Sequence, residues 1–220
     1  LIKILEILFT KEEAELVFKL PIRLFTVEEA SLRWDLSEKD TKIILSNLAD
    51  KGILFDLQHE KTQAYFLAPP MAGFFEFSLM RTDGKFNRKV LSELFYQYIN
   101  QEPDYIKMMV RINTPVCRTF IHEDQIEKED YSVVLDYEKA THIINTASCI
   151  TVGTCYCRHK KSHLGTACQM PQEVCLTFNK TAESLSKHGI AKKISKTEAL
   201  KILDQCRNLG LVQIGDNIQE

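Results

Sequence analysis

The sequence has no excess of basic charge. Its 220 residues include 28 Lys and Arg against 30 Asp and Glu, which gives a formal net charge of −2. Such a balance provides no bulk attraction to nucleic acid or to an anionic membrane surface. Any contact with nucleic acid would therefore have to be local.

Long apolar runs are also lacking. The sequence contains neither a run of about 20 apolar residues, which a membrane-spanning helix needs, nor a secretory signal, so we expect no membrane span and a cytoplasmic location. Because the chain begins at Leu1, we expect its natural start to lie upstream. A Gly-rich phosphate loop and a paired nucleophile and base are missing as well, which argues against a stand-alone enzyme.

Composition is that of an ordinary globular protein, with 45% hydrophobic residues and no low-complexity segment or internal repeat. At this length, one large domain or two smaller ones can bury a core without disulfide bonds. The seven cysteines are odd in number and four of them are clustered. In a reducing cytosol this pattern indicates metal ligands or reactive thiols rather than a disulfide framework.

The first 80 residues have the pattern of a helix-rich module closed by a hairpin. Apolar residues recur at helical spacing through residues 1–52, with Thr10 and Thr26 placed as N-caps and Gly52 as a C-terminal stop. Two strand-like runs rich in aromatic and branched residues follow between positions 53 and 69. Helices followed by a hairpin predict a winged helix over residues 1–80.

The remaining sequence divides at about residue 113. Apolar residues at helical spacing over 86–98 predict a helix with one face in a core or in a dimer seam. Next we expect strands at 115–121 and 132–136 around a charged loop, then a helix, a strand that delivers the cysteine cluster, and a final packing helix.

Together these patterns predict an α+β protein in three parts. The parts are an N-terminal winged helix (1–80), a helical connector that is a candidate dimer helix (81–112), and a small C-terminal α/β domain carrying a cysteine-rich cluster loop (113–220).

The clustered cysteines are Cys155, Cys157, Cys168 and Cys175. Four thiolates near one point are what a structural zinc ion or an iron–sulfur cluster requires. Their spacing matches neither the bacterial ferredoxin run nor a zinc ribbon, so spacing alone indicates a metal without naming it. Cations in the same segment, such as Arg158, would offset the negative charge of a thiolate cage of either kind.

Other interpretations of the cysteines remain open. The four can simply be buried thiols, although the segment around them is polar and poor core material. His159 and His163 can instead complete a mixed zinc site. For Cys117, Cys149 and Cys206 we expect packing roles, because each lies in an apolar strand or helix pattern.

The segments "APPMAGFFEFSLMR", "CYCRHK" with the later C and P-x-x-x-C, and "EALKILDQCRNLGLVQ" resemble the 4Fe-4S ferredoxin-type proteins of bacteria and archaea that have an N-terminal winged helix. The resemblance covers nearly the whole chain. It implies a [4Fe-4S] cluster bound by Cys155, Cys157, Cys168 and Cys175, with Arg158 and Pro171 flanking the motif. Family members commonly continue into further cysteine-rich repeats, so the chain is expected to be a fragment or a short member.

Three functions follow as hypotheses. The first is an iron–sulfur protein in electron transfer, with a redox partner protein and a winged helix used for docking or for forming a homodimer. The second is a redox- or metal-sensing DNA-binding regulator, which is less favoured because the charges of the expected recognition helix sum to zero. The third is a structural zinc protein.

Overall fold

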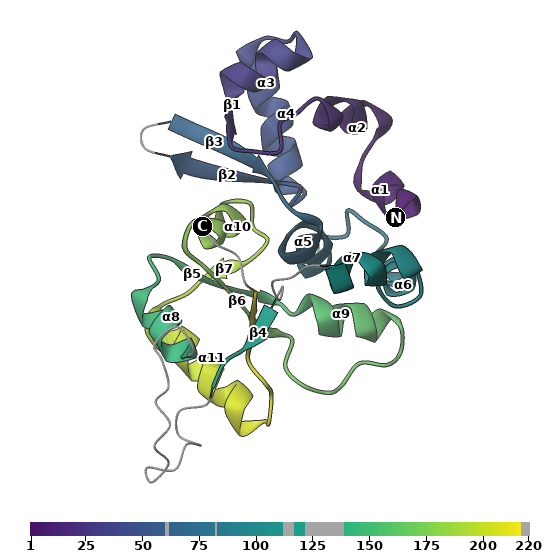
Figure 1. Cartoon of the computed structure of the whole chain (residues 1–220). Helices are drawn as coiled ribbons and strands as arrows, with labels where there is room; N and C mark the ends of the chain where they lie inside the picture. The colour runs from purple at the N-terminus through teal and green to yellow at the C-terminus, as the bar shows by residue number, and fades with distance from the viewer. Residues whose placement is uncertain (60–61, 82, 112–116, 122–138, 217–220) are drawn as a thin grey trace.

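The computed structural model describes residues 1–59, 62–81, 83–111, 117–121 and 139–216. It is a mixed structure of helices and small sheets, in agreement with the expected α+β class (Figure 1). Within these residues, no helix is long and apolar enough to cross a membrane.

The N-terminal part contains helices and a three-stranded sheet. Its elements are α1 (Ile2–Leu8), α2 (Lys11–Phe18), β1 (Phe25–Thr26), α3 (Val27–Trp34), α4 (Glu38–Asp50), β2 (Leu54–His59) and β3 (Thr62–Leu67). The strands are antiparallel in the order β1-β3-β2. The N-caps predicted at Thr10 and Thr26 are confirmed, since each forms a capping box with the glutamate three residues on. These local bonds satisfy amide groups that a helix start leaves unpaired.

One hydrophobic core holds this part together. Trp34 of α3, Leu45 and Leu48 of α4, and Phe25 and Tyr65 of the sheet are buried in one cluster. The indole Nε1 of Trp34 donates a hydrogen bond to the carbonyl oxygen of Leu16 at 2.8 Å, which ties α3 to α2. Burial of such large apolar side chains is the main stabilising contribution to the module.

Helices connect this part to the rest of the chain. They are η1 (Pro70–Phe74), a π-helical turn, α5 (Phe75–Met80), α6 (Arg88–Asn100) and α7 (Pro103–Arg111). Leu91 and Phe95 of α6 are buried against Phe75 of α5 and Ile4 of α1. The apolar face of this helix therefore lies in a core of the monomer.

The C-terminal part is built around a second sheet. Its elements are β4 (Cys117–Thr119), α8 (Ala140–Thr146), β5 (Ile150–Thr154), α9 (Tyr156–His163), β6 (Glu173–Phe178), α10 (Asn179–Lys187), β7 (Lys192–Lys193), α11 (Lys196–Asn208) and β8 (Ile214–Asp216). Strands β6, β5 and β7 pair antiparallel in that order, and β4 pairs with β8.

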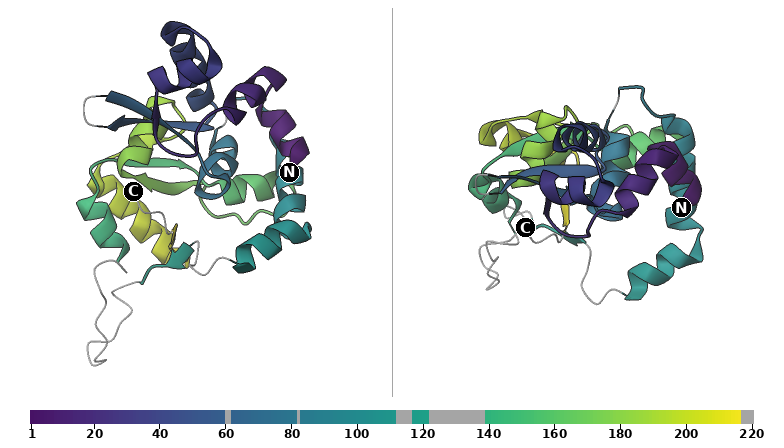
Figure 2. Two further views of the ribbon diagram at one scale, coloured as in Figure 1. Left: turned by 45° about the horizontal axis from the view of Figure 1, so that its top comes forward. Right: turned by 90° about the horizontal axis from the view of Figure 1, so that it is seen from above.

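Helices cover both faces of the β6-β5-β7 sheet. Leu185 of α10 packs in one cluster with Phe55 of β2, whereas Ile144 of α8 and Ala199 of α11 pack against Ile150 of β5. Figure 1 shows α10 between this sheet and the β2–β3 hairpin, with α8 and α11 on the far side of the sheet. Figure 2 shows α6 and α7 at the side of the molecule away from α8 and α11.

The C-terminal part differs from expectation in several places. Residues 156–163, expected as a loop, form helix α9, and neither α10 nor the strands β6, β7 and β8 were predicted. The predicted strand at 132–136 and the charged loop before it lie outside the described residues.

Candidate functional site

The candidate site lies where β5 ends and α9 begins. Cys155 is the N-cap residue of α9, and its carbonyl oxygen accepts the hydrogen bond from His159 N at 2.9 Å. The Cys155 amide donates to the carbonyl oxygen of Gln172 at 2.6 Å. This bond brings the segment that carries Cys168 back to the end of β5.

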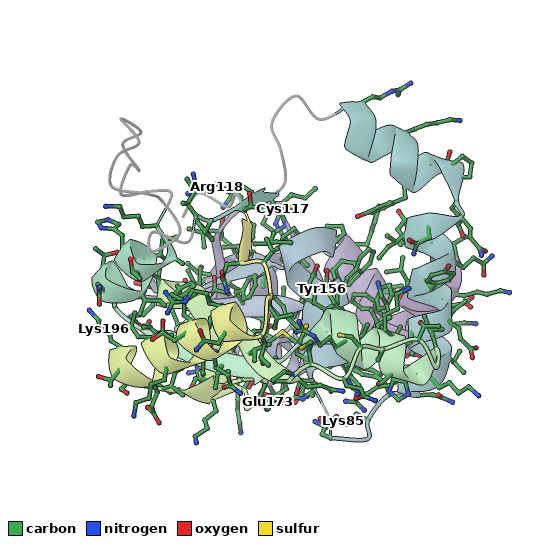
Figure 3. All side chains as sticks on the ribbon, turned by 90° about the horizontal axis from the view of Figure 1, so that it is seen from below. Lys85, Cys117, Arg118, Tyr156, Glu173 and Lys196 are labelled. Atoms are coloured by element: carbon green, nitrogen blue, oxygen red, sulfur yellow. The ribbon has the colours of Figure 1, made fainter. Side chains whose placement is uncertain are left out.

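Cys175 reaches the same region from the neighbouring strand. It lies opposite Gly153 in the β5–β6 ladder, which is irregular between Gly153 and Thr154. The Thr154 hydroxyl donates to Glu173 Oε1 at 2.6 Å and fixes the start of β6. Figure 3 labels Tyr156 at the start of α9 and Glu173 at the start of β6, the residues that flank the junction.

Cys155 and Cys157 form a hydrogen-bonded pair of thiols. This bond is the largest cause that lowers the pKa of Cys155 to about 5; nearby backbone amides and the charge of Arg158 act in the same direction, and burial opposes them. The same bond is the largest cause that raises the pKa of Cys157 above its usual range. One sulfur of the pair is therefore a thiolate at neutral pH, while the other keeps its proton.

Arg158 joins Cys168 to this pair. Burial lowers the pKa of Arg158, but hydrogen bonds and charge interactions with Cys168 and Cys155 outweigh it and raise the pKa. Cys168 has a lowered pKa, because the Met170 amide and then the Arg158 guanidinium donate hydrogen bonds to its sulfur. The guanidinium thus lies beside two of the four cysteines and contributes to lowering the pKa of each.

The site opens to solvent on one side. Cys157 and Cys168 are exposed, whereas Cys155 and Cys175 are half-buried. Cys175 also packs against the apolar cluster that contains Met80 and Leu185. Cys157 and Cys168 therefore lie at the exposed edge of the site, and Cys175 lies against its apolar wall.

The geometry is not that of a closed metal cage. In the part of the chain that the structure describes, no three or more His, Cys, Asp and Glu side chains are placed to hold a metal ion together. His159 and His163, the alternative zinc ligands, contact each other instead through their Nε2 atoms at 3.1 Å. His159 Nδ1 lies 2.5 Å from the carbonyl oxygen of Leu79, so this ring is held by α5.

Two of the three remaining cysteines occupy the expected buried positions. Cys149 and Cys206 are buried, but Cys117 in β4 is exposed, and the packing role expected for it is wrong. Within the described residues, the three-residue strand β4 pairs only with β8, in a two-stranded sheet.

Cys206 also has an unexpected neighbourhood. Burial raises its pKa, and the charges of Arg158 and Cys155 act on it as well, so Cys206 of α11 lies within electrostatic reach of the thiol group. The sequence around Cys206 has the pattern of a packing helix. No local signal therefore predicts that Cys206 lies within electrostatic reach of Arg158 and Cys155.

Comparisons of the chain with protein-family models, with curated proteins and with solved structures found no match. The resemblance to 4Fe-4S ferredoxin-type proteins therefore rests only on the three sequence segments named above, of which the cysteine motif is one. Besides this resemblance, the arrangement of the thiols in the structure is the evidence from which a function can be inferred.

Proposed function

We propose that the chain is an iron–sulfur protein that binds a [4Fe-4S] cluster through Cys155, Cys157, Cys168 and Cys175 and takes part in electron transfer. The observation that carries this proposal is the group of thiols around Arg158, in which Cys155 and Cys168 both contact one guanidinium. A bound [4Fe-4S] cluster accepts and donates single electrons.

The donor set fits such a cluster in its chemistry. Iron–sulfur clusters are held by thiolates, and the lowered pKa values of Cys155 and Cys168 favour that form. Arg158 would offset part of the negative charge of four thiolates. Among the described residues these four side chains are not arranged around one point, so binding of a cluster would require the thiols to move together.

Exposure of Cys157 and Cys168 supports exchange of electrons with another protein. A redox partner must approach a centre closely, and on its buried side the site packs through Cys175 against the apolar cluster that contains Met80. The partner would therefore dock on the side where these two cysteines lie.

For the N-terminal part we propose a winged-helix fold that serves in docking or dimerisation. The helices α3 and α4 followed by the β2–β3 hairpin, with β1 at the sheet edge, support this assignment. On the outer face of α4, exposed acidic and basic residues balance. Lys51 just beyond it is held by Glu13 at 2.6 Å and is not free for a phosphate.

Exposed apolar side chains on this module are a further reason to favour a protein contact over DNA. Phe18 and Ile22 are each 91% exposed and Leu32 is 84% exposed. Exposed apolar side chains gain from contact with another protein, whereas phosphates require cations. Both a homodimer and a redox partner fit this chemistry.

The proposal is tested by metal analysis of protein purified without oxygen. We expect a brown protein with about four iron atoms and about four acid-labile sulfide ions per chain. Cys168→Ser should lower both contents, as should the same change at the three other proposed ligands.

Cys117→Ser is the matched control, because Cys117 is exposed like Cys168 but lies in β4. It should leave iron and sulfide unchanged. A colourless protein that contains zinc would show a structural zinc site instead, and iron content unaffected by Cys168→Ser would refute the ligand assignment.

A further inference from the structure

A cavity of about 400 Å³ lies between the end of α5 and the β6-β5-β7 sheet. Its walls are Met80 and Arg81, residues 152–154 of β5, Glu173 of β6 and residues 189–192. Figure 1 shows α5 and β5 together at this place. The volume falls within the range of about 300–1,000 Å³ that small-molecule sites occupy.

Arg81 has an incomplete set of partners in this cavity wall. Its side chain is only 10% exposed. Nη2 donates to the carbonyl oxygen of His188 at 2.8 Å, and Nε lies 2.8 Å from Asp83 Oδ2, whereas Nη1 has no hydrogen-bond partner among the residues that the structure describes. A buried guanidinium donor without an acceptor is costly, so an acceptor supplied by a ligand would be favourable.

Positive charge around Arg81 exceeds the negative charge available to it. Asp83 is shared by three cations, since Arg88 Nη2 lies 2.9 Å and Lys85 Nζ 3.9 Å from its carboxylate oxygens. Lys192 adds a fourth cation from β7. Even with Glu173 of the wall and Glu198 of α11, three carboxylates stand against four cations, and the remaining positive charge favours the approach of an anion.

Carboxylates near the cavity limit what it can accept. Glu173 is in the wall, and its Oε1 is bound by the Thr154 hydroxyl. Glu198 of α11 lies within electrostatic reach of Lys192 and reduces its effect. Arg81 is therefore the principal positive group, and Glu173 would repel a bulky polyanion while accepting a hydrogen bond from a hydroxyl or amino group.

Backbone amides contribute little at this place. The amides of Gly189, Ile190 and Ala191 already donate to carbonyl oxygens of Ser186 and Leu185. Recognition of a ligand would therefore depend on the side chains of Arg81 and Lys192.

We propose that this cavity binds a small oxyanion, a carboxylate or a phosphate, with Arg81 as its main partner and Lys192 as the second. Such a ligand would lie beside the strand that carries the candidate cysteine site, because Gly153 of the wall pairs with Cys175 and Thr154 precedes Cys155. The binding does not depend on a cluster at the cysteines.

Titration calorimetry of the purified protein with inorganic phosphate, and separately with succinate, tests the proposal at constant ionic strength. We expect one saturable site for at least one of the two anions. Binding only by phosphate would identify the ligand class as a phosphate, and binding only by succinate as a carboxylate.

Two variants and a control locate the site. Arg81→Lys, which keeps the charge but removes Nη1, should weaken binding about tenfold, and Lys192→Gln about threefold to fivefold. Lys193→Gln is the matched control, because Lys193 is exposed on the same strand but outside the cavity wall. If a thermal melt shows that Arg81→Lys is unfolded, the comparison of Lys192→Gln with Lys193→Gln still tests the proposal.

The proposal is overturned by absence of saturable binding of both anions at millimolar concentration. Equal effects of Lys192→Gln and Lys193→Gln would overturn it too, since they would show non-specific attraction to the surface.

Discussion

At the scale of single residues, Cys155 is set apart from the other cysteines by what surrounds its sulfur. It accepts a hydrogen bond from Cys157 and lies near backbone amides at the start of α9 and near the Arg158 guanidinium. Each of these favours the thiolate over the thiol, and together they outweigh the burial that opposes it. The charge of Cys155 thus depends on its immediate neighbours and not on the net charge of the protein.

This gives a prediction for the reactivity of the thiols in metal-free, reduced protein. With a pKa of about 5, Cys155 is already a thiolate at pH 7, and its alkylation by iodoacetamide should slow only as the pH falls toward 5. Cys157→Ala removes the largest stabilising contact, so the midpoint of the profile should move to higher pH. Peptide mass spectrometry after timed alkylation measures the rate at each pH.

Cys117→Ala is the control for this experiment, because Cys117 lies in β4 and does not act on the pKa of Cys155. It should leave the Cys155 profile unchanged. A midpoint near pH 8.5 for Cys155 in the parent protein would contradict the role given to Cys157 and Arg158.

At the scale of elements, local sequence signals such as helix caps predicted many of the helices and strands. Contacts between elements that are distant in the sequence could not be predicted. The capping box of Ser195 with Glu198 and the stop at Gly210 are short-range features, and α11 forms between them as expected. Helix α9 was missed because its residues are charged and polar and show no apolar period. The stabilising contacts of α9 come from elsewhere, such as Lys161 over the Tyr96 ring of α6 at 4.8 Å.

The same distinction applies to the candidate site. The spacing of the cysteines indicated a thiol cluster, because Cys155 and Cys157 are close in any conformation. The contact of Arg158 with Cys168 depends on the path of residues 164–172, and the proximity of Cys206 depends on the packing of α11. Neither has a signature in the local sequence.

The junction of α4 with α5 gives a prediction at this scale. Gly52 follows α4 with φ +75°, and a Cβ atom there would lie 2.8 Å from Phe77 Cβ of α5. Gly52→Ala therefore adds a steric clash to the backbone strain, and we expect it to lower the free energy of unfolding by about 2–4 kcal/mol. Urea denaturation followed by circular dichroism measures the change.

Gly84→Ala separates the two causes. Gly84 has a similar φ of +78°, but nothing lies within 4 Å of its Cβ position. It should cost about 1 kcal/mol from backbone strain alone. Equal losses for the two variants would show that the contact between α4 and α5 is not tight.

At the scale of the whole molecule, a buried polar network joins the N-terminal part to the cysteine-bearing sheet. His188, at the end of α10, places Nδ1 2.5 Å from Asp50 Oδ1 of α4 and Nε2 2.9 Å from Asp56 Oδ1 of β2. Ser184 of α10 donates to the same Asp56 oxygen at 2.8 Å, and Lys187 pairs with the other. Because both ring nitrogens face carboxylates, the imidazolium form of His188 is favoured over the neutral ring.

The stability of the protein should therefore depend on pH in a definite direction. Burial lowers the pKa of His188, but hydrogen bonds with Asp56 and Asp50 outweigh it and raise the pKa above 6.5. The stabilisation is fully present below pH 6.5 and is lost as the pH rises through the folded-state pKa. Burial raises the pKa of Asp56, but bonds from His188, Lys187 and Ser184 lower it to about 2, so its contribution is lost as the pH falls from 3.8 toward 2.

We expect the free energy of unfolding to be highest between these limits and to decrease above pH 6.5. His188→Gln should lower it by about 3 kcal/mol at pH 6, because Asp56 is left buried with fewer partners, and should flatten the decrease above pH 6.5. Urea denaturation from pH 5 to pH 9 gives both quantities. His142→Gln, at an exposed position on α8, should leave the curve unchanged. A parent protein as stable at pH 9 as at pH 6 would mean that the His188 imidazolium does not join the two parts.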